Sequence, residues 1–350
     1  MPFSHHSHSK DYIAHGSGPL DEVVEAVLKQ EFHTFCFSEH MPRLSSKYLY
    51  PEEIADKSDT NFLKQQFDNY LHKVLTIKKT YKDSSTNFII GTECECADSE
   101  HISYAKNMFD NYYKGKLQYL VGSIHHVNSV PIDYDVETFE KAIVRADNSF
   151  LEFLKGYFNL QYTMLTELKP PVVGHFDLPS LFIKDSKLRI DKDTGKVLDE
   201  MNFEKKDSFI TINEFDIDDY IFTIFKDSLY PLVERNLKFI IDNNLALEIN
   251  TSGLRKKLKY PYPSIKLALL FKQLGGKFVL SDDSHGLNQL GTNYLKCKEE
   301  YIKGALKLDT IYYLKEQTPY NPESLSLPEV KLEPMDIKEF NELPYWSNIK

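Results

Sequence analysis

Histidine and carboxylate residues recur in this sequence in short motifs whose spacing suits metal binding. His6 and His8 form an HxH motif, and Asp283 and His285 form a DxH motif. Alternate residues of an extended segment point to the same side, so both members of each motif can reach one ion. Imidazole and carboxylate ligands together favour Zn, Fe or Mn over Mg or Ca. The two motifs therefore predict a transition-metal site.

Further candidate ligands follow other apolar runs of the chain. The full candidate set is His6, His8, His15, His40, Glu93, His125, His175, Asp283 and His285. One zinc ion takes about four ligands, so a set of this size indicates about three divalent ions that share a carboxylate. Close neighbours compete for these roles, because Glu95 can face the same way as Glu93, His126 adjoins His125, and Asp282 adjoins Asp283.

The elements that must position these side chains are short apolar runs separated by helical periodicity. The predicted strands are residues 34–38, 87–91, 118–124, 171–174, 245–249 and 277–281, with a short strand before His5 and another at 310–314. The predicted helices are residues 19–28, 62–80, 100–113, 136–154, 221–243 and 264–274. This alternation is typical of a parallel sheet covered by helices, with enough strands to close a barrel. The candidate ligands follow strand C-termini, which meet on one rim of a barrel.

Length, charge and composition narrow the function classes. The chain has 350 residues and a net charge of −10. We expect one barrel domain over residues 1–350, with an insertion at about 181–210 and a C-terminal segment at about 317–350 that wraps the surface. The acidic balance disfavours nucleic acid, and no apolar run approaches the ~20 residues of a membrane span. We expect a cytoplasmic monomer or small homo-oligomer that acts on a small molecule.

The motifs HHSHS, SEHMPR, GTE, GSIHHV, GHFDLP, EINTSGLRK and SDDSH, in that order, resemble the PHP (polymerase and histidinol phosphatase) superfamily. The resemblance extends from His6 to about Gly291 and is strongest to the histidinol-phosphatase branch of fungi and many bacteria. It implies an α/β fold, a distorted (β/α)7 TIM-like barrel with insertions, and a trinuclear metal centre at the C-terminal rim.

The resemblance also implies how the ligands divide among three ions. One ion would be held by His6, His8, Glu93 and Asp283, a second by Glu93, His125 and His175, and a third by His15, His40 and His285. The GxE and GSxH matches favour Glu93 over Glu95 and His125 over His126, and the DxH spacing favours Asp283 over Asp282.

The implied activity is that of a phosphoric monoester hydrolase. It would convert L-histidinol phosphate to L-histidinol and phosphate, a late step of histidine biosynthesis. A metal-bridging hydroxide held by Glu93 and Asp283 would attack phosphorus, and Arg43, Arg255 and His126 would bind substrate. Candidates to receive the substrate's ammonium and imidazole groups are Asp11, Glu39 and Asp177. The alternatives are a phosphoesterase of the same superfamily with a different phosphomonoester or phosphodiester substrate, a metal-storage protein, and an amidohydrolase-like enzyme.

Overall fold

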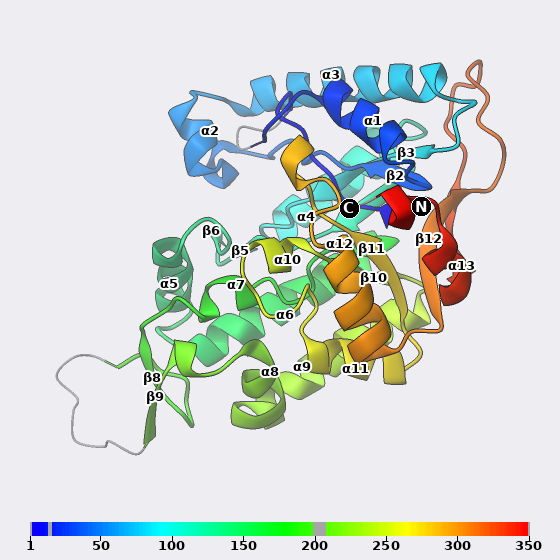
Figure 1. Cartoon of the computed structure of the whole chain (residues 1–350). Coiled ribbons are helices and arrows are strands. Elements are labelled where there is room, and N and C mark those ends of the chain that lie inside the picture. Colours follow the sequence, from blue (N-terminus) through cyan, green and yellow to red (C-terminus); the bar gives the residue numbers. More distant parts are fainter. Residues whose placement is uncertain (1, 13–15, 199–207, 349–350) are drawn as a thin grey trace.

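A computed structural model describes residues 2–12, 16–198 and 208–348. Its largest sheet has nine strands, which are all parallel except for the antiparallel last pair (Figure 1). In spatial order they are β1 (Phe3–Ser4), β2 (Thr34–Phe37), β3 (Asn87–Cys94), β4 (Tyr119–Gly122), β7 (Val172–Val173), β10 (Ala246–Asn250), β11 (Lys277–Ser281), β12 (Thr310–Glu316) and β13 (Val330–Asp336).

The sheet curls until its first strand meets β11 and β12. Nδ1 of His5 lies 2.9 Å from the carbonyl oxygen of Leu280, and Nε2 of His5 accepts the N–H of Leu314 at 3.1 Å. Beyond β1, Ser7 forms a parallel bridge with Ser284, which follows β11. These contacts close a distorted barrel, which confirms the α/β barrel that the sequence predicted.

A small apolar cluster fills the barrel, and each strand from β2 to β12 in the sheet order contributes to it. Its members are Cys36, Ile89, Tyr119, Val121, Val172, Ala246, Val279 and Leu314, all buried. Because side chains alternate across a strand, the neighbours of these residues point outward toward the helices. A second and larger core lies there. The barrel therefore presents a rigid set of strand ends to the rim.

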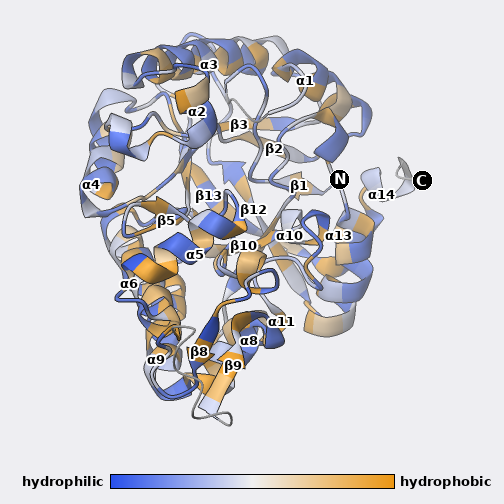
Figure 2. Cartoon of the chain, turned by 90° about the vertical axis from the view of Figure 1, so that its left-hand side faces the viewer, coloured by the Kyte–Doolittle hydropathy of each residue, from blue (hydrophilic) through white to orange (hydrophobic). Residues whose placement is uncertain are grey.

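Helices surround the strands, as Figure 2 shows in a view onto the strand ends. Their bounds are α1 (Leu20–Lys29), α2 (Pro51–Ala55), α3 (Thr60–Thr80), α4 (Ser99–Asn107), α5 (Val136–Arg145), α6 (Phe150–Leu168), α7 (Ser180–Ile183), α8 (Ile217–Asp219), α9 (Lys226–Asp242), α10 (Ser252–Arg255), α11 (Ile265–Gln273), α12 (Tyr294–Lys296), α13 (Ile337–Glu342) and α14 (Tyr345–Asn348). Within the described residues, no helix is both long and apolar enough to cross a membrane.

The prediction of one continuous helix at residues 136–154 is wrong. The periodicity of residues 136–154 predicted a single helix, but the structure has α5 and α6 with a break between them. Asp147 and Asn148 take left-handed φ values of 54° and 53°, which end α5. The Ser149 side chain then accepts the N–H of Glu152 and caps α6. Asp and Asn tolerate this conformation, and Ser is a preferred N-cap, so local chemistry outweighed the hydrophobic period.

Two segments were predicted to lie outside the barrel. The predicted insertion at 181–210 contains β8 (Arg189–Asp191) and reaches β9 (Phe209–Thr211), and these two strands form an antiparallel pair beyond the barrel in Figure 1. Residues 199–207 of that prediction lie outside the described residues. The C-terminal segment does more than wrap the surface, because β13 extends the sheet beside β12 and α13 packs Phe340 into the core.

Candidate metal centre

Glu93 lies at the C-terminal end of β3 and is the hub of the predicted ligand set. Its Oε2 lies 3.1 Å from Nε2 of His6, 3.4 Å from Nε2 of His8 and 3.0 Å from Nδ1 of His40. His6 and His8 follow β1, and His40 follows β2. One carboxylate oxygen thus faces imidazoles from two neighbouring strand ends.

The other oxygen of Glu93 faces a different pair of imidazoles. Its Oε1 lies 3.4 Å from Nε2 of His125, which follows β4, and 3.3 Å from Nε2 of His175, which follows β7. The ligand atoms of these three residues all lie within 4.8 Å of one another. Because its two oxygens serve two separate groups of imidazoles, Glu93 has the geometry of a carboxylate that bridges two ions.

Asp283, after β11, is the second carboxylate of the cluster. Its Oδ1 lies 3.7 Å from Nε2 of His6, 3.6 Å from Nε2 of His8 and 3.6 Å from Nδ1 of His285. Its backbone is left-handed, with φ of 48°. This conformation is uncommon for residues other than glycine, although aspartate tolerates it, and it recurs at functional sites.

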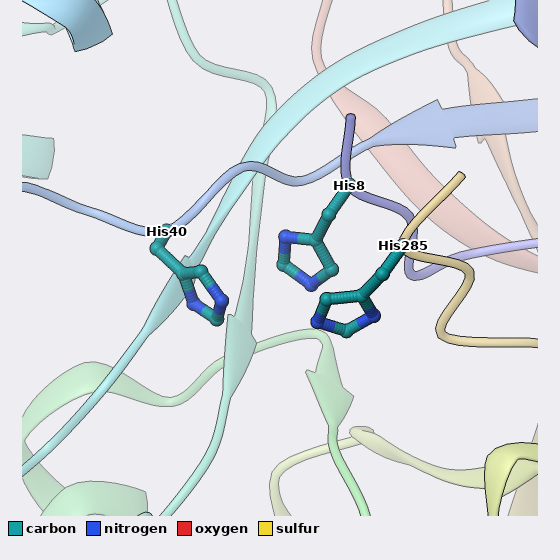
Figure 3. Close-up of side chains that lie close together, drawn as sticks. All are labelled: His8, His40 and His285. Carbon is teal, nitrogen blue, oxygen red and sulfur yellow. The ribbon is translucent and has the colours of Figure 1, made fainter. Parts of the chain in front are cut away.

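A third group consists of histidines alone. His8, His40 and His285 come from three strand ends and place their rings together, as Figure 3 shows. The ring of His8 lies 4.3 Å from that of His40 and 4.5 Å from that of His285, measured between centroids. The sequence predicted His15 in this group. His15 lies outside the described residues, and His8 occupies the place beside the other two.

The chemistry of the cluster fits divalent cations. Within the described residues, Nε2 of His6 and both ring nitrogens of His8 are buried and form no hydrogen bond. Buried polar atoms are nearly always paired in native proteins. Several such nitrogens next to carboxylate oxygens, on rigid strand ends, are the donor set that a transition metal satisfies.

The electrostatics lead to the same conclusion. Burial favours neutral imidazole, but the Glu95 and Glu93 carboxylates together outweigh it and raise the pKa of His40 to about 10. Glu95 and Glu93 likewise raise the pKa of His125 to about 9 against the effect of burial. Burial also disfavours a charged Glu93, yet the imidazoles, His6 foremost, hold its pKa well below the usual range. The carboxylates thus attract positive charge, which protons or metal ions can supply.

Glu95 was predicted as the alternative to Glu93, and its carboxylate lies with that of Glu93 and the ring of His40 in a further group whose ligand atoms are all within 4.8 Å of one another. Its Oε1 is 2.5 Å from Nδ1 of His40, and its Oε2 is 3.1 Å from Nδ1 of His125. The Tyr50 hydroxyl donates to the same Oε2 at 3.0 Å. Glu95 therefore contacts two imidazoles, those of His40 and His125, while Glu93 contacts five.

The sequence reasoning missed Glu248, in the middle of β10. Nδ1 of His6 lies 2.9 Å from Oε1 of Glu248, while Oε2 accepts the backbone N–H of His175 and the Nδ2 amide of Asn250, both at 2.9 Å. Asn250 also donates to Oδ2 of Asp283 at 3.2 Å. A carboxylate inside the apolar run LALEI was a signal, because a buried charge needs partners.

The three predicted substrate-binding residues occupy different surroundings. A pocket of about 590 Å³ opens over the metal cluster, and Arg255 lines it. Arg43 is buried elsewhere, with Nη1 3.2 Å from Glu95 and Nη2 donating to Glu53 at 3.2 Å. His126 is buried, with its ring centroid 5.5 Å from that of Tyr50. Neither Arg43 nor His126 is among the residues that line the pocket.

The three candidates for the substrate's ammonium and imidazole groups all have protein partners. Asp11 accepts the first N–H of α1, and Glu39 accepts the N–H and hydroxyl of Ser9. Asp177 accepts the backbone N–H just before α11, and burial raises the pKa of its carboxyl to about 7. None of the three lines the pocket over the cluster.

Comparison with known families decides the relationship. A family model described as the PHP domain matches residues 4–252, a span that includes the strand ends from β1 to β10. The chain belongs to the PHP domain family. The resemblance that the motifs predicted is therefore confirmed.

Relatives of this PHP-family chain extend the match to its full length. It is 40% identical over 354 aligned residues to histidinol-phosphatase of Saccharomyces cerevisiae, with 99% of each chain covered. Among solved structures, a Listeria monocytogenes protein aligns with a TM-score of 0.62 and 21% identity, covering 84% of this chain and 99% of that one.

A second solved structure is that of histidinol phosphate phosphatase from Lactococcus lactis, complexed with zinc, L-histidinol and phosphate. It aligns with a TM-score of 0.52 and 17% identity, covering 81% of this chain and 86% of that one. At these identities, the two structures support the fold of the PHP-family chain rather than its substrate.

Proposed function

We propose that this PHP-family chain is a histidinol-phosphatase, a phosphoric monoester hydrolase that converts L-histidinol phosphate to L-histidinol and phosphate. The observation that carries the proposal is the 40% identity to the yeast enzyme over 99% of both chains. The geometry supports the same class of reaction, because buried imidazoles and carboxylates converge under a pocket large enough for a small substrate.

Several divalent metal ions fit the cluster, and we assign three, of Zn, Fe or Mn. His6, His8, Glu93 and Asp283 would hold one ion, and Glu93 with His125 and His175 a second. His40 and His285 would hold the third with His15 or His8. The proposal is supported by the groups His6–His8–Asp283, Glu93–His125–His175 and His8–His40–His285, whose ligand atoms lie within 4.8 Å of one another in each group. It is also supported by the zinc in the Lactococcus lactis relative.

Bound divalent ions lower the pKa of a coordinated water toward 7 and neutralise charge on phosphate oxygens. The protein's own contribution is positioning. The two oxygens of Glu93 fix the spacing between two groups of imidazoles. Oδ1 of Asp283 faces Nε2 of His6 and of His8, the same two atoms that Glu93 faces. Reacting groups held in this way meet in a fixed geometry, which lowers the entropic cost of the reaction.

Arg255 is our candidate for binding the phosphate. Its Nη1 and Nη2 donate to the carbonyls of Asp282 at 3.0 Å and Asp283 at 2.9 Å, which anchor the guanidinium at the pocket wall. Those bonds use two of the five N–H groups that a guanidinium carries. The remaining N–H groups can donate to phosphate oxygens, as arginine commonly does.

The test is phosphate release by purified protein supplied with Mn, Zn or Fe. We expect hydrolysis of L-histidinol phosphate at a kcat/KM well above that for bis-p-nitrophenyl phosphate, a phosphodiester. Comparable turnover of the diester would favour the alternative, a PHP phosphoesterase with a different substrate. Absence of L-histidinol phosphate hydrolysis in metal-loaded protein would refute the proposal.

A further inference from the structure

The pocket over the metal centre contains two carboxylates that do not belong to the metal cluster. Of the described residues that line it, these are Glu52, in α2, and Asp133. Asp133 lies in the short connection between β6 (Val130–Pro131) and α5, followed by the half-exposed Tyr134, which also lines the pocket. Both carboxylates line the pocket that a substrate would occupy, so each is placed to contact a positively charged group of that substrate.

Asp133 lies next to the predicted metal ligand His125. Its Oδ2 lies 4.0 Å from Nε2 of His125, an atom that also faces Glu93. Its side chain is 18% exposed, and its Oδ1 is buried and forms no hydrogen bond within the described part of the chain. A buried acceptor without a donor is costly to keep. A donor on a bound ligand would remove that cost.

The pocket is also electrostatically divided. Arg255 and Lys256 line it on the side of Asp283, to whose carbonyl oxygen Arg255 donates. Asp133 stands beside His125 instead. The two products of the proposed reaction also differ in charge, because phosphate is an anion and L-histidinol carries an ammonium group. A substrate with phosphate at Arg255 would place its cationic half toward the carboxylate.

We propose that Asp133 is a specificity-determining residue that accepts a hydrogen bond from the ammonium group of the substrate. This inference rests on the proposed histidinol-phosphatase function and deepens it, because it names the residue that distinguishes a cationic phosphomonoester from one without a cation. Asp133 acts on the part of the substrate that does not react, so its contribution appears as selectivity between substrates.

The experiment compares two substrates in the metal-loaded, full-length protein. We measure kcat/KM for L-histidinol phosphate and for p-nitrophenyl phosphate, which has no ammonium group, in the wild type and in Asp133→Asn. A hydrogen bond to a charged group has the strength to lower the ratio of the two constants about 10- to 100-fold. Asp133→Glu, which keeps the charge, should recover part of that ratio. Bound metal is measured in each variant.

Two further variants serve as controls. Glu137→Gln removes the same charge four residues away, from an exposed position outside the pocket lining, and should leave the ratio near the wild-type value. Glu52→Gln removes the other pocket carboxylate and should lower the ratio less than Asp133→Asn does. A ratio that falls in Glu52→Gln and not in Asp133→Asn would overturn the assignment.

The remaining outcomes also decide. Equal loss on both substrates together with loss of bound metal would overturn the inference, because Asp133 would then support the metal centre. A wild-type preference for L-histidinol phosphate that persists in Asp133→Asn would overturn the inference alone. A wild type that cleaves p-nitrophenyl phosphate but not L-histidinol phosphate would refute the proposed function and the inference together.

Discussion

Glu248→Gln is the sharpest test of how the barrel holds its metal ligands. The glutamate is fully buried, and its oxygens face Nδ1 of His6 on one side and two donors on the other, the N–H of His175 and the Nδ2 amide of Asn250. Glutamine has the same shape but only one acceptor oxygen. In one orientation of the glutamine amide, its NH2 group faces the two donors of His175 and Asn250. In the other orientation, it faces Nδ1 of His6, which needs a carboxylate acceptor.

The size of the effect follows from the bonds that are lost. A hydrogen bond to a charged group contributes about 1.5–3 kcal/mol, and 1.36 kcal/mol corresponds to about a factor of ten. Losing one such bond to His6 or His175 predicts that metal affinity falls about 10- to 100-fold, which is also the usual effect of removing a partner behind a metal ligand. Catalytic activity should recover when excess metal is added, because the ligands themselves remain.

The assay titrates metal-free protein with Zn or Mn in a competing chelator and follows both bound metal and phosphatase activity. Asp218→Asn is the matched control. Asp218 is a buried carboxylate that accepts the Ser264 hydroxyl at 2.6 Å and the N–H of Lys266 at 3.0 Å, away from the metal cluster. Its substitution should lower the melting temperature without shifting the metal titration.

Two results would refute the reasoning about Glu248. One is a wild-type metal titration curve for Glu248→Gln, which would mean that the carboxylate does not orient its ligands. The other is loss of activity that excess metal does not restore while metal binding is normal, which would place Glu248 in the reaction itself. A loss of metal affinity equal to that in Asp218→Asn would indicate only general destabilisation.

Three other predictions concern the same cluster. Glu93→Ala should remove more bound metal than Asp283→Ala, because Glu93 faces two groups of imidazoles. The metal content of each folded variant tests this, and a wild-type content in both would contradict it. Metal uptake should release protons and strengthen as pH rises toward 9. The pKa values of about 10 for His40 and about 9 for His125 keep both rings protonated at pH 7 before metal binds, whereas ligation needs neutral imidazole. If the rings were neutral, calorimetry in buffers of different ionisation enthalpy would show no proton release. Arg255→Lys should raise the inhibition constant of inorganic phosphate about 10-fold through loss of a charged hydrogen bond, and an unchanged constant in product-inhibition assays would exclude Arg255 from phosphate binding.

The strands of the barrel could be predicted because each is a short, apolar run. Residues 277–281 were predicted as a strand and form β11 with the same bounds, and residues 34–38 contain β2. Such strands are buried on both faces, so their composition alone separates them from the amphipathic helices. The break at Ala146–Ser149 was missed because a hydrophobic period does not register a local turn, although Asp147, Asn148 and Ser149 carry the chemistry of one.

The candidate site was predictable to the extent that its residues follow strand ends. The sequence placed Glu93 and His175 at one rim because parallel strands end together, and the structure brings them within 3.3 Å. It could not show Glu248 behind His6, because 242 positions separate the two residues and only the barrel makes them neighbours. It also could not show that Arg43 is paired with Glu95, since a pairing of side chains has no sequence period.

The charge of the protein and the charge of its site have to be considered separately. The chain carries a net charge of −10, and four of its carboxylates, those of Glu93, Glu95, Asp283 and Glu248, are buried close together. Such a site would repel a phosphate if its only compensation came from hydrogen bonds. In the metal-free protein, Arg43 pairs with Glu95, and the raised pKa values of His6, His40 and His125 let protons offset part of the remaining charge. The three divalent ions that we propose would together carry more positive charge than the four carboxylates carry negative charge, so with Arg255 they would make the loaded site positive. An acidic protein can thus attract an anionic substrate, because the cations that the carboxylates hold dominate the local field.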